Sequence, residues 1–280
     1  MNETTESPFP VVLQVLPALD GGGVERGTVE VTQAITRTGG TALVASAGGR
    51  LVPSVLRAGG KHVTLKLDSK NPWRIWRNAR ALAQLIRDER VDIVHARSRA
   101  PAWVALGAAR LTGTPFVTTY HGSYAGQSVL KVLYNSVMAR GDAVIANSQF
   151  TADRILRMHP FAADRIHVIH RGTDFRAFMP EQVDAERVAR LRQSWGLAPD
   201  DRIVLLAARL TSWKGQRVLI EAAKLWASVI ERGVAVGELR DDVEARLVVA
   251  AMFDAVLSTT RWFAGVRPQQ PDRVGDALAD

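Results

Sequence analysis

Three consecutive glycines, Gly21, Gly22 and Gly23, stand between an apolar run and a helical stretch that begins at about Val24. Glycine lets backbone N–H groups come close to a ligand, and a helix N-terminus favours an anion. The loop, together with Glu25 in the helix that follows, is therefore a candidate phosphate-binding site. It does not match GxGxxG, so a dinucleotide fingerprint is not supported. A tight turn that needs glycine for its geometry is the alternative.

Two histidines, His95 and His121, each fall at the carboxyl end of a predicted strand. The carboxyl ends of parallel strands share one rim, where open α/β sheets bind ligands. A histidine there can donate a hydrogen bond to a hydroxyl or a phosphate, or transfer a proton. The alternative for each is a structural histidine inside the protein. The pair lacks metal-ligand spacing and has no accompanying carboxylate pair, so we expect no metal.

Two cations, Arg209 and Lys214, follow an apolar run at 202–208 that is predicted to be a strand. Arginine can hold a diphosphate in a bidentate fork, and lysine can bind it as a point charge. The two residues are therefore a candidate diphosphate clamp. A pair of solvated basic residues is the alternative.

A helix predicted over 72–90 carries Trp73, Arg77, Arg80 and Arg87 on one face, at spacings of three and four residues. A basic face with a tryptophan suits an anionic membrane surface, so this face is a candidate for peripheral membrane contact. A plain solvated face is the alternative. No stretch approaches the roughly 20 apolar residues that span a bilayer.

Alternating strands and helices must position these residues. Before residue 172 the chain holds seven short runs that are apolar or alternate in polarity, and helical stretches separate most of them. This order predicts an α/β fold with a parallel sheet covered on both faces. We expect strands at 11–19, 41–48, 61–67, 91–96, 115–121, 141–148 and 165–172, and helices at 24–37, 72–90, 101–111, 127–139, 149–158, 183–195 and 216–231.

The chain has 280 residues, 47% hydrophobic and 23% charged, so one large or two modest soluble domains fit. The strand, glycine loop and helix that begin near residue 202 predict a second α/β domain. The absence of cysteine excludes disulfides and thiolate chemistry and fits a cytoplasmic protein. The first ten residues hold no basic residue and no apolar run, so we expect no secretory signal.

The net charge of +8 is unevenly placed. Residues 226–280 hold 6 Lys and Arg against 9 Asp and Glu, which leaves 30 and 19 in residues 1–225. The basic first part suits anionic partners such as phosphates, nucleotides or lipid headgroups. No zinc finger, aromatic RNA-binding signature or helix-turn-helix pattern is present, so we expect no nucleic-acid partner. GxxxxGK[ST] is also absent, which excludes a P-loop ATPase.

The ordered motifs resemble those of glycosyltransferase family 4, retaining enzymes of GT-B architecture. The resemblance covers roughly residues 10–225. No single motif is specific to that family, but the order and spacing of the motifs are. The matching segments are 21–25, 91–99, 120–122, 143–155, 168–178 and 205–223.

The resemblance implies a transferase that uses a nucleotide sugar as donor. It implies that Gly22 and Gly23 approach the donor phosphates or the acceptor, and that His121, the candidate catalytic residue, lies near the transferred sugar. It also implies that Arg209 and Lys214 neutralise the leaving diphosphate. No metal or other cofactor is required if those cations suffice.

The same resemblance implies a Rossmann-like acceptor domain over 1–180, with Glu25, His95 and Arg97 lining the acceptor cleft. A linker and the start of the nucleotide-sugar domain would follow over 181–225. The implied acceptor is a cell-envelope glycolipid, oligosaccharide or lipopolysaccharide, reached from the cytoplasm by peripheral contact with the inner membrane. Nothing after about residue 225 matches that family, so we expect a shortened donor domain whose activity is reduced or lost.

Residues 226–280 instead resemble the carboxyl-terminal helices of TetR-type repressors, which bind effectors and dimerise. We expect helices at 243–263 and 271–279 and a homodimer through 243–279. This tail and the charge change suggest a gene fusion. Two further readings stay open: a non-catalytic binding or dimerising protein, and a degenerate fusion product.

Overall fold

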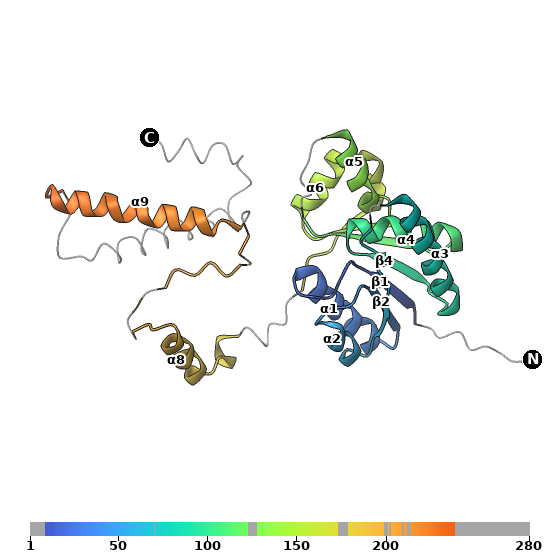
Figure 1. Ribbon diagram of the computed structural model, residues 1–280, viewed down its shortest axis with the longest axis horizontal. Coiled ribbons are helices and arrows are strands. Elements are labelled where there is room, and N and C mark those ends of the chain that lie inside the picture. Colours follow the sequence, from blue (N-terminus) through green and yellow to red (C-terminus); the bar gives the residue numbers. More distant parts are fainter. Residues whose placement is uncertain are drawn as a thin grey trace, which may run out of the picture. The chain divides into compact units, whose positions relative to one another are not determined.

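The computed structural model of this chain divides into two compact units, residues 1–173 and 174–280, shown in Figure 1. The domain boundaries expected from the sequence stay predictions. The structure describes residues 9–69, 71–122, 128–172, 179–198, 201, 203–208, 210–211 and 214–238.

A sheet of seven parallel strands forms the centre of the first unit, in the order β3-β2-β1-β4-β5-β6-β7. All seven strands predicted from the sequence are present, each shorter than its apolar run. The chain moves outward from β1 in one direction and then returns to add β4 on the other side of β1. The strands are β1 (Val11–Val15), β2 (Thr41–Ser46), β3 (Lys61–Thr64), β4 (Ile93–Ala96), β5 (Phe116–Tyr120), β6 (Ala143–Ala146) and β7 (Ile166–Val168).

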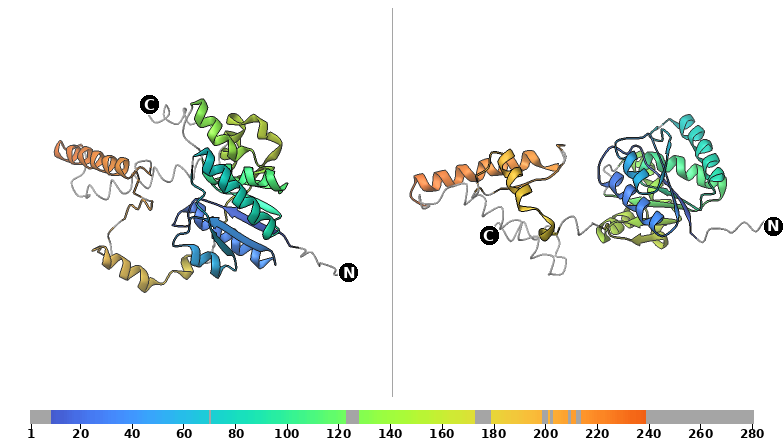
Figure 2. Two further views of the ribbon diagram at one scale, coloured as in Figure 1. Left: turned by 45° about the vertical axis from the view of Figure 1, so that its right-hand side comes forward. Right: turned by 90° about the horizontal axis from the view of Figure 1, so that it is seen from below.

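Helices cover both faces of this sheet, as Figures 1 and 2 show. Right-handed crossovers place α1 and α2 on one face and the later helices on the other, because the direction of travel reverses after β3. The first unit is therefore a three-layer Rossmann-like sandwich. The helices are α1 (Gly23–Arg37), α2 (Val52–Arg57), α3 (Pro72–Asp88), α4 (Arg99–Thr112), α5 (Val129–Asn135) and α6 (Gln149–Met158), with 3-10 turns η1 (Ser136–Ala139) and η2 (Pro160–Arg165).

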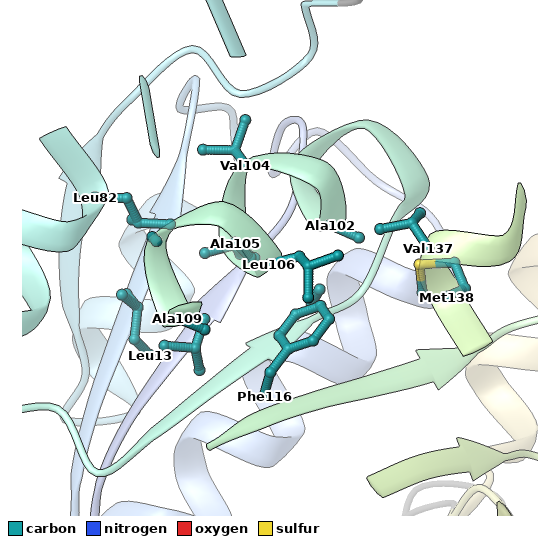
Figure 3. Close-up of a cluster of buried hydrophobic side chains, with 14 of the residues drawn as sticks. Leu13, Leu82, Ala102, Val104, Ala105, Leu106, Ala109, Phe116, Val137 and Met138 are labelled. Atoms are coloured by element: carbon teal, nitrogen blue, oxygen red, sulfur yellow. The ribbon is translucent and has the colours of Figure 1, made fainter. Parts of the chain in front are cut away.

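The larger apolar core lies between the sheet and the α3–α4 layer. Successive strand residues point to opposite faces, so Leu13 of β1 joins this core while its neighbour Gln14 faces α1. Figure 3 shows Leu82 of α3 and Phe116 of β5 packed around α4, with Met138 closing the far side. All four apolar residues named here are almost completely buried.

Local capping explains where α3 begins. The Asn71 side chain accepts hydrogen bonds from Trp73 N at 2.9 Å and Arg74 N at 3.4 Å, and Pro72 occupies the first helical position.

The short helix α2 was not predicted, because six residues that include Pro53 are too few to show a helical period.

The second unit holds α8 (Ala185–Ser194), α9 (Gln216–Ala235) and the 3-10 turn η3 (Pro180–Gln182) among its described residues. The strand expected at 202–208 is wrong for the described residues 203–208, which form no ladder. A strand needs a partner strand, and the described part of this unit offers none. Leu205 is accordingly 68% exposed. The helices expected at 243–263 and 271–279, and the dimer segment 243–279, lie outside the described residues.

Among the described residues, no helix has both the length and the apolar character needed to cross a bilayer.

Replacing Leu82 with alanine tests the packing of α3 on α4. Leu82 is fully buried. The substitution should lower the free energy of unfolding by about 2–5 kcal/mol, because it removes buried methyl groups and leaves a cavity. Urea unfolding followed by circular dichroism measures the change. Leu130→Ala, at a side chain that is 78% exposed, is the control and should change stability by about 0.5 kcal/mol or less. Equal effects of the two variants would contradict the assigned core.

Candidate functional site

The candidate site lies at the point where the strand order reverses. β1 pairs with β2 on one side and β4 on the other. Open α/β sheets bind ligands in the crevice at the carboxyl ends of the strands at such a point. Gly21–Gly23 follow β1, and Arg97 follows β4 directly. The fold therefore brings together two features that are far apart in the sequence.

A cavity of about 170 Å³ opens beside this crevice, between α1 and the ends of β4 to β7. Its walls include two of the residues predicted for the acceptor cleft, His95 and Arg97, and the predicted catalytic residue His121. Other side chains that line it are Glu30, Thr119, Asn147 and Arg171. Each lies on α1, in a strand of the sheet or shortly after one, so the secondary structure of the first unit positions the whole set.

The side chain of Gln14 holds the Arg97 guanidinium in place. Its Nη1 donates to Oε1 of Gln14 at 3.2 Å, and Gln14 Nε2 donates to Thr28 O at 3.2 Å and to Thr32 Oγ1 at 3.0 Å. The arginine is 5% exposed, and its Nε has no hydrogen-bond partner among the described residues. Burial, then the charge of Arg171, lowers the pKa of the Arg97 guanidinium to about 10, so it stays charged at neutral pH.

The two histidines differ in their partners. The Nε2 atom of His95 lies 2.7 Å from Thr119 Oγ1, whereas neither ring nitrogen of His121 has a partner among the described residues. Burial is the main cause that lowers the pKa of each imidazole to about 3, and the charge of Arg97 adds to it in both cases. Arg171 contributes further at His121. Both imidazoles are therefore neutral at pH 7. His121 suits hydrogen bonding to a ligand better than proton transfer, because so weak a base is rarely protonated.

Arginines occupy the space beside the glycine-rich start of α1. A Cβ at Gly21 would lie 2.6 Å from Nη2 of Arg50, and one at Gly23 would lie 2.7 Å from Nη1 of Arg171. Arg50 also donates through Nε to the carbonyl oxygen of Asp20. These glycines therefore admit guanidinium groups, which makes the mouth of the crevice more positive than the glycine loop alone indicates.

Several predicted site residues lie outside the cavity wall. Glu25 folds back over Gly22, where a Cβ would meet its Oε2 at 2.5 Å. Lys214 is exposed in the second unit, next to Gly215, which caps α9. Arg209 lies outside the described residues. Their proposed roles stay predictions, as does that of Gly22.

The residues predicted to face a membrane share the exposed side of α3. Trp73 and Trp76 are stacked with ring centroids 4.9 Å apart, and the Arg80 guanidinium lies 4.0 Å from the Trp76 ring centroid. Arg77 is exposed beside them. Arg87 differs from the others because its Nη2 donates to Leu111 O at 3.2 Å, at the end of α4.

The sequence reasoning missed Arg50, Arg171 and Gly27. Arg171 follows β7, just as His95 and His121 mark the ends of β4 and β5. Open α/β sheets bind ligands at the carboxyl ends of their strands, and this principle could have identified Arg171 as well. Gly27 gives no such signal in the sequence, since the role of a glycine inside a helix depends on the residues that pack against it in the folded protein. In the described part of the chain, no group of three metal-ligating side chains could hold a metal ion.

The depressed histidine pKa values predict acid sensitivity. Below pH 6.5 the unfolded chain takes up protons at His95 and His121, while the folded chain does so only near pH 3. The free energy of unfolding should therefore fall as pH drops through this window, by at most about 1.4 kcal/mol per pH unit for each histidine. Urea unfolding at about pH 7.5 and about pH 5 measures this fall.

His121→Gln should make the same pH dependence shallower, whereas His167→Gln on the exposed edge strand β7 should leave it unchanged. An unaltered slope in His121→Gln would show that this imidazole is not held neutral by the fold.

Comparison with known proteins places this geometry in a family. The profile of Glycosyltransferase Family 4 matches residues 21–176. The D-inositol 3-phosphate glycosyltransferase 1 of Catenulispora acidiphila is 31% identical over 144 residues, which cover 47% of this chain and 33% of that protein. The chain thus spans about a third or less of the curated relatives it matches.

Solved structures agree on the fold. A glycosyltransferase from Rickettsia africae is 39% identical with a TM-score of 0.68, covering 78% of this chain and 58% of that one. Anabaena HepE in complex with UDP-glucose has a TM-score of 0.63 at 21% identity, covering 77% and 57% of the two chains. The predicted Rossmann-like sheet of GT-B glycosyltransferases is confirmed. Because the profile match extends over more than half of its residues, this chain belongs to Glycosyltransferase Family 4.

Proposed function

We propose that this chain transfers a sugar from a nucleotide sugar to a hydroxyl group of a cell-envelope acceptor of the glycolipid or lipopolysaccharide type. The observation that carries the proposal is the convergence of Arg97, His121 and Arg171 on one cavity at the switch point of the sheet. Open α/β sheets bind their ligands at this place. Family membership supplies the class of reaction.

In this reaction the acceptor oxygen forms a bond to the anomeric carbon of the donor sugar. The bond from that carbon to the phosphate oxygen breaks, and the nucleoside diphosphate leaves with the electron pair. The hydroxyl proton passes to the departing phosphate or to water. Retention of the anomeric configuration is part of the proposal and follows the resemblance to retaining enzymes.

Negative charge grows on the departing diphosphate, so fixed cations near it lower the barrier. We assign this role to Arg209 and Lys214, with the backbone of Gly22 and Gly23 as further donors. His121 would hydrogen-bond a sugar hydroxyl, because its imidazole is neutral at pH 7. Uridine nucleotides are the first donors to test, since HepE, which shares the fold, was solved with UDP-glucose.

Calorimetric titration with nucleoside diphosphates and their sugars tests the donor site. Wild type should bind at least one of them, and Lys214→Ala should bind it about tenfold or more weakly. A hydrogen bond to a charged group contributes roughly 1.5–3 kcal/mol, and about 1.4 kcal/mol is a tenfold change. Lys224→Ala removes an exposed charge from α9 and should bind as wild type does.

Two results would count against the assigned clamp. Equal losses in Lys214→Ala and Lys224→Ala would show only a general charge effect. No binding by wild type at millimolar ligand would favour the non-catalytic alternative, a protein that binds the acceptor or dimerises.

An acceptor embedded in a membrane requires the cavity to reach the lipid surface. Each helix of a parallel α/β fold begins where a strand ends, so helix α3 begins on the carboxyl side of the sheet. The cavity lies on the same side. Its exposed Trp73 and Trp76 lie beside Arg80, a combination of aromatic and cationic groups that suits an anionic lipid interface. We therefore assign this face to peripheral membrane contact.

Vesicle sedimentation tests this contact. The chain should bind phosphatidylglycerol vesicles, and the affinity should fall with added salt because the attraction is partly electrostatic. The double variant Trp73→Ala/Trp76→Ala should bind several-fold more weakly. Trp195→Ala, at another exposed tryptophan beyond α8, is the matched control. Binding that is unchanged in the double variant would remove α3 from the membrane assignment.

A further inference from the structure

Arg97 carries a buried charge without a carboxylate partner among the described residues. Its guanidinium donates to the neutral amide of Gln14, and the guanidinium Nε has no hydrogen-bond partner among those residues. An ion that is removed from water is costly unless an opposite charge or a full set of hydrogen bonds replaces the water. The described protein therefore leaves this cation incompletely compensated.

A second guanidinium adds to the deficit. A Cβ at Gly27 would lie 2.9 Å from Nη2 of Arg97 and 3.4 Å from Nη2 of Arg171, so the two groups are neighbours on one side of α1. Glu30 is the carboxylate that the described residues place near them, at 4.0 Å from Nη2 of Arg171, and it is 58% exposed. Two cations thus face one loosely placed anion, and the cavity wall has a net positive charge.

The missing side chain at Gly27 permits this arrangement. Glycine inside a helix is unfavourable relative to alanine, so its presence in the second turn of α1 needs a reason. Here a Cβ would come closer to the Arg97 guanidinium than a side chain can, so that the guanidinium would have to shift. Gly27 therefore makes α1 less stable but leaves room for the two guanidinium groups.

Resting on the proposed function, we propose that Arg97 and Arg171 bind a phosphate monoester carried by the acceptor. The side chains assigned above to the donor diphosphate, Arg209 and Lys214, belong to the second unit, so Arg97 and Arg171 have no assigned ligand. A phosphate monoester carries close to two negative charges at neutral pH and so matches two cations. Its oxygens also accept the paired hydrogen bonds that a guanidinium offers.

The test uses calorimetry on the full chain, without any sugar donor. The probes are inorganic phosphate, glucose 6-phosphate, glucose and UDP. Wild type should bind inorganic phosphate and glucose 6-phosphate, and it should not bind glucose measurably. Arg97→Gln and Arg171→Gln should each weaken binding of glucose 6-phosphate tenfold or more. Arg110→Gln, which removes an exposed charge from α4, should leave it unchanged.

Gly27→Ala separates binding from folding. This variant keeps both charges and strengthens α1, so its Tm should equal or exceed that of wild type, while binding of glucose 6-phosphate falls tenfold or more. It therefore keeps the proposal testable if Arg97→Gln does not fold.

Three outcomes would overturn the proposal. They are no binding of either phosphate by wild type, unchanged phosphate binding in Arg171→Gln and Gly27→Ala, and loss of UDP binding in the arginine variants while glucose 6-phosphate still binds. Failure of the proposed function is distinct. If no nucleotide sugar is used but phosphate binding still depends on Arg97 and Arg171, the anion site stands and the transfer reaction does not.

Discussion

The buried amide of Gln14 connects the sheet, helix α1 and the cavity. It lies in the central strand β1, donates to the backbone of Thr28 and the hydroxyl of Thr32, and accepts from Arg97. A polar side chain with no solvent exposure must satisfy its hydrogen bonds inside the protein, so these partners are fixed together. The position of α1 on the sheet and the position of the guanidinium thus depend on one another.

The electrostatics of the cavity follow from this arrangement. Burial disfavours the charged form of His95 and His121, and the cation Arg97 beside them adds to this effect, so both imidazoles stay neutral at pH 7. Neutral imidazoles and guanidinium groups together form a site that offers hydrogen bonds and attracts negative charge. Such a site is suited to orienting an anionic sugar derivative, and the bond change itself would depend on groups that stabilise the departing phosphate.

The two units differ in whether their apolar segments pair as strands. The first is a complete three-layer sandwich in which every strand pairs with a neighbour, and this part carries the family match. The second shows two helices and the unpaired apolar segment 203–208 among its described residues. An apolar run becomes a strand only when another strand satisfies its backbone, so the pattern that served well in the first unit failed in the second.

The sequence by itself determined the seven strands, all the longer helices of the described chain and the rim on which His95, Arg97 and His121 lie. These features depend on hydrophobic period and on the direction of parallel strands, both of which are local or follow from chain order. Only the tertiary structure decided that Arg171 meets Arg97 at Gly27, and that Arg50 covers Gly21. Those contacts join residues separated by long stretches of chain. Their positions depend on how the strands are ordered and how the helices pack, which no local pattern records.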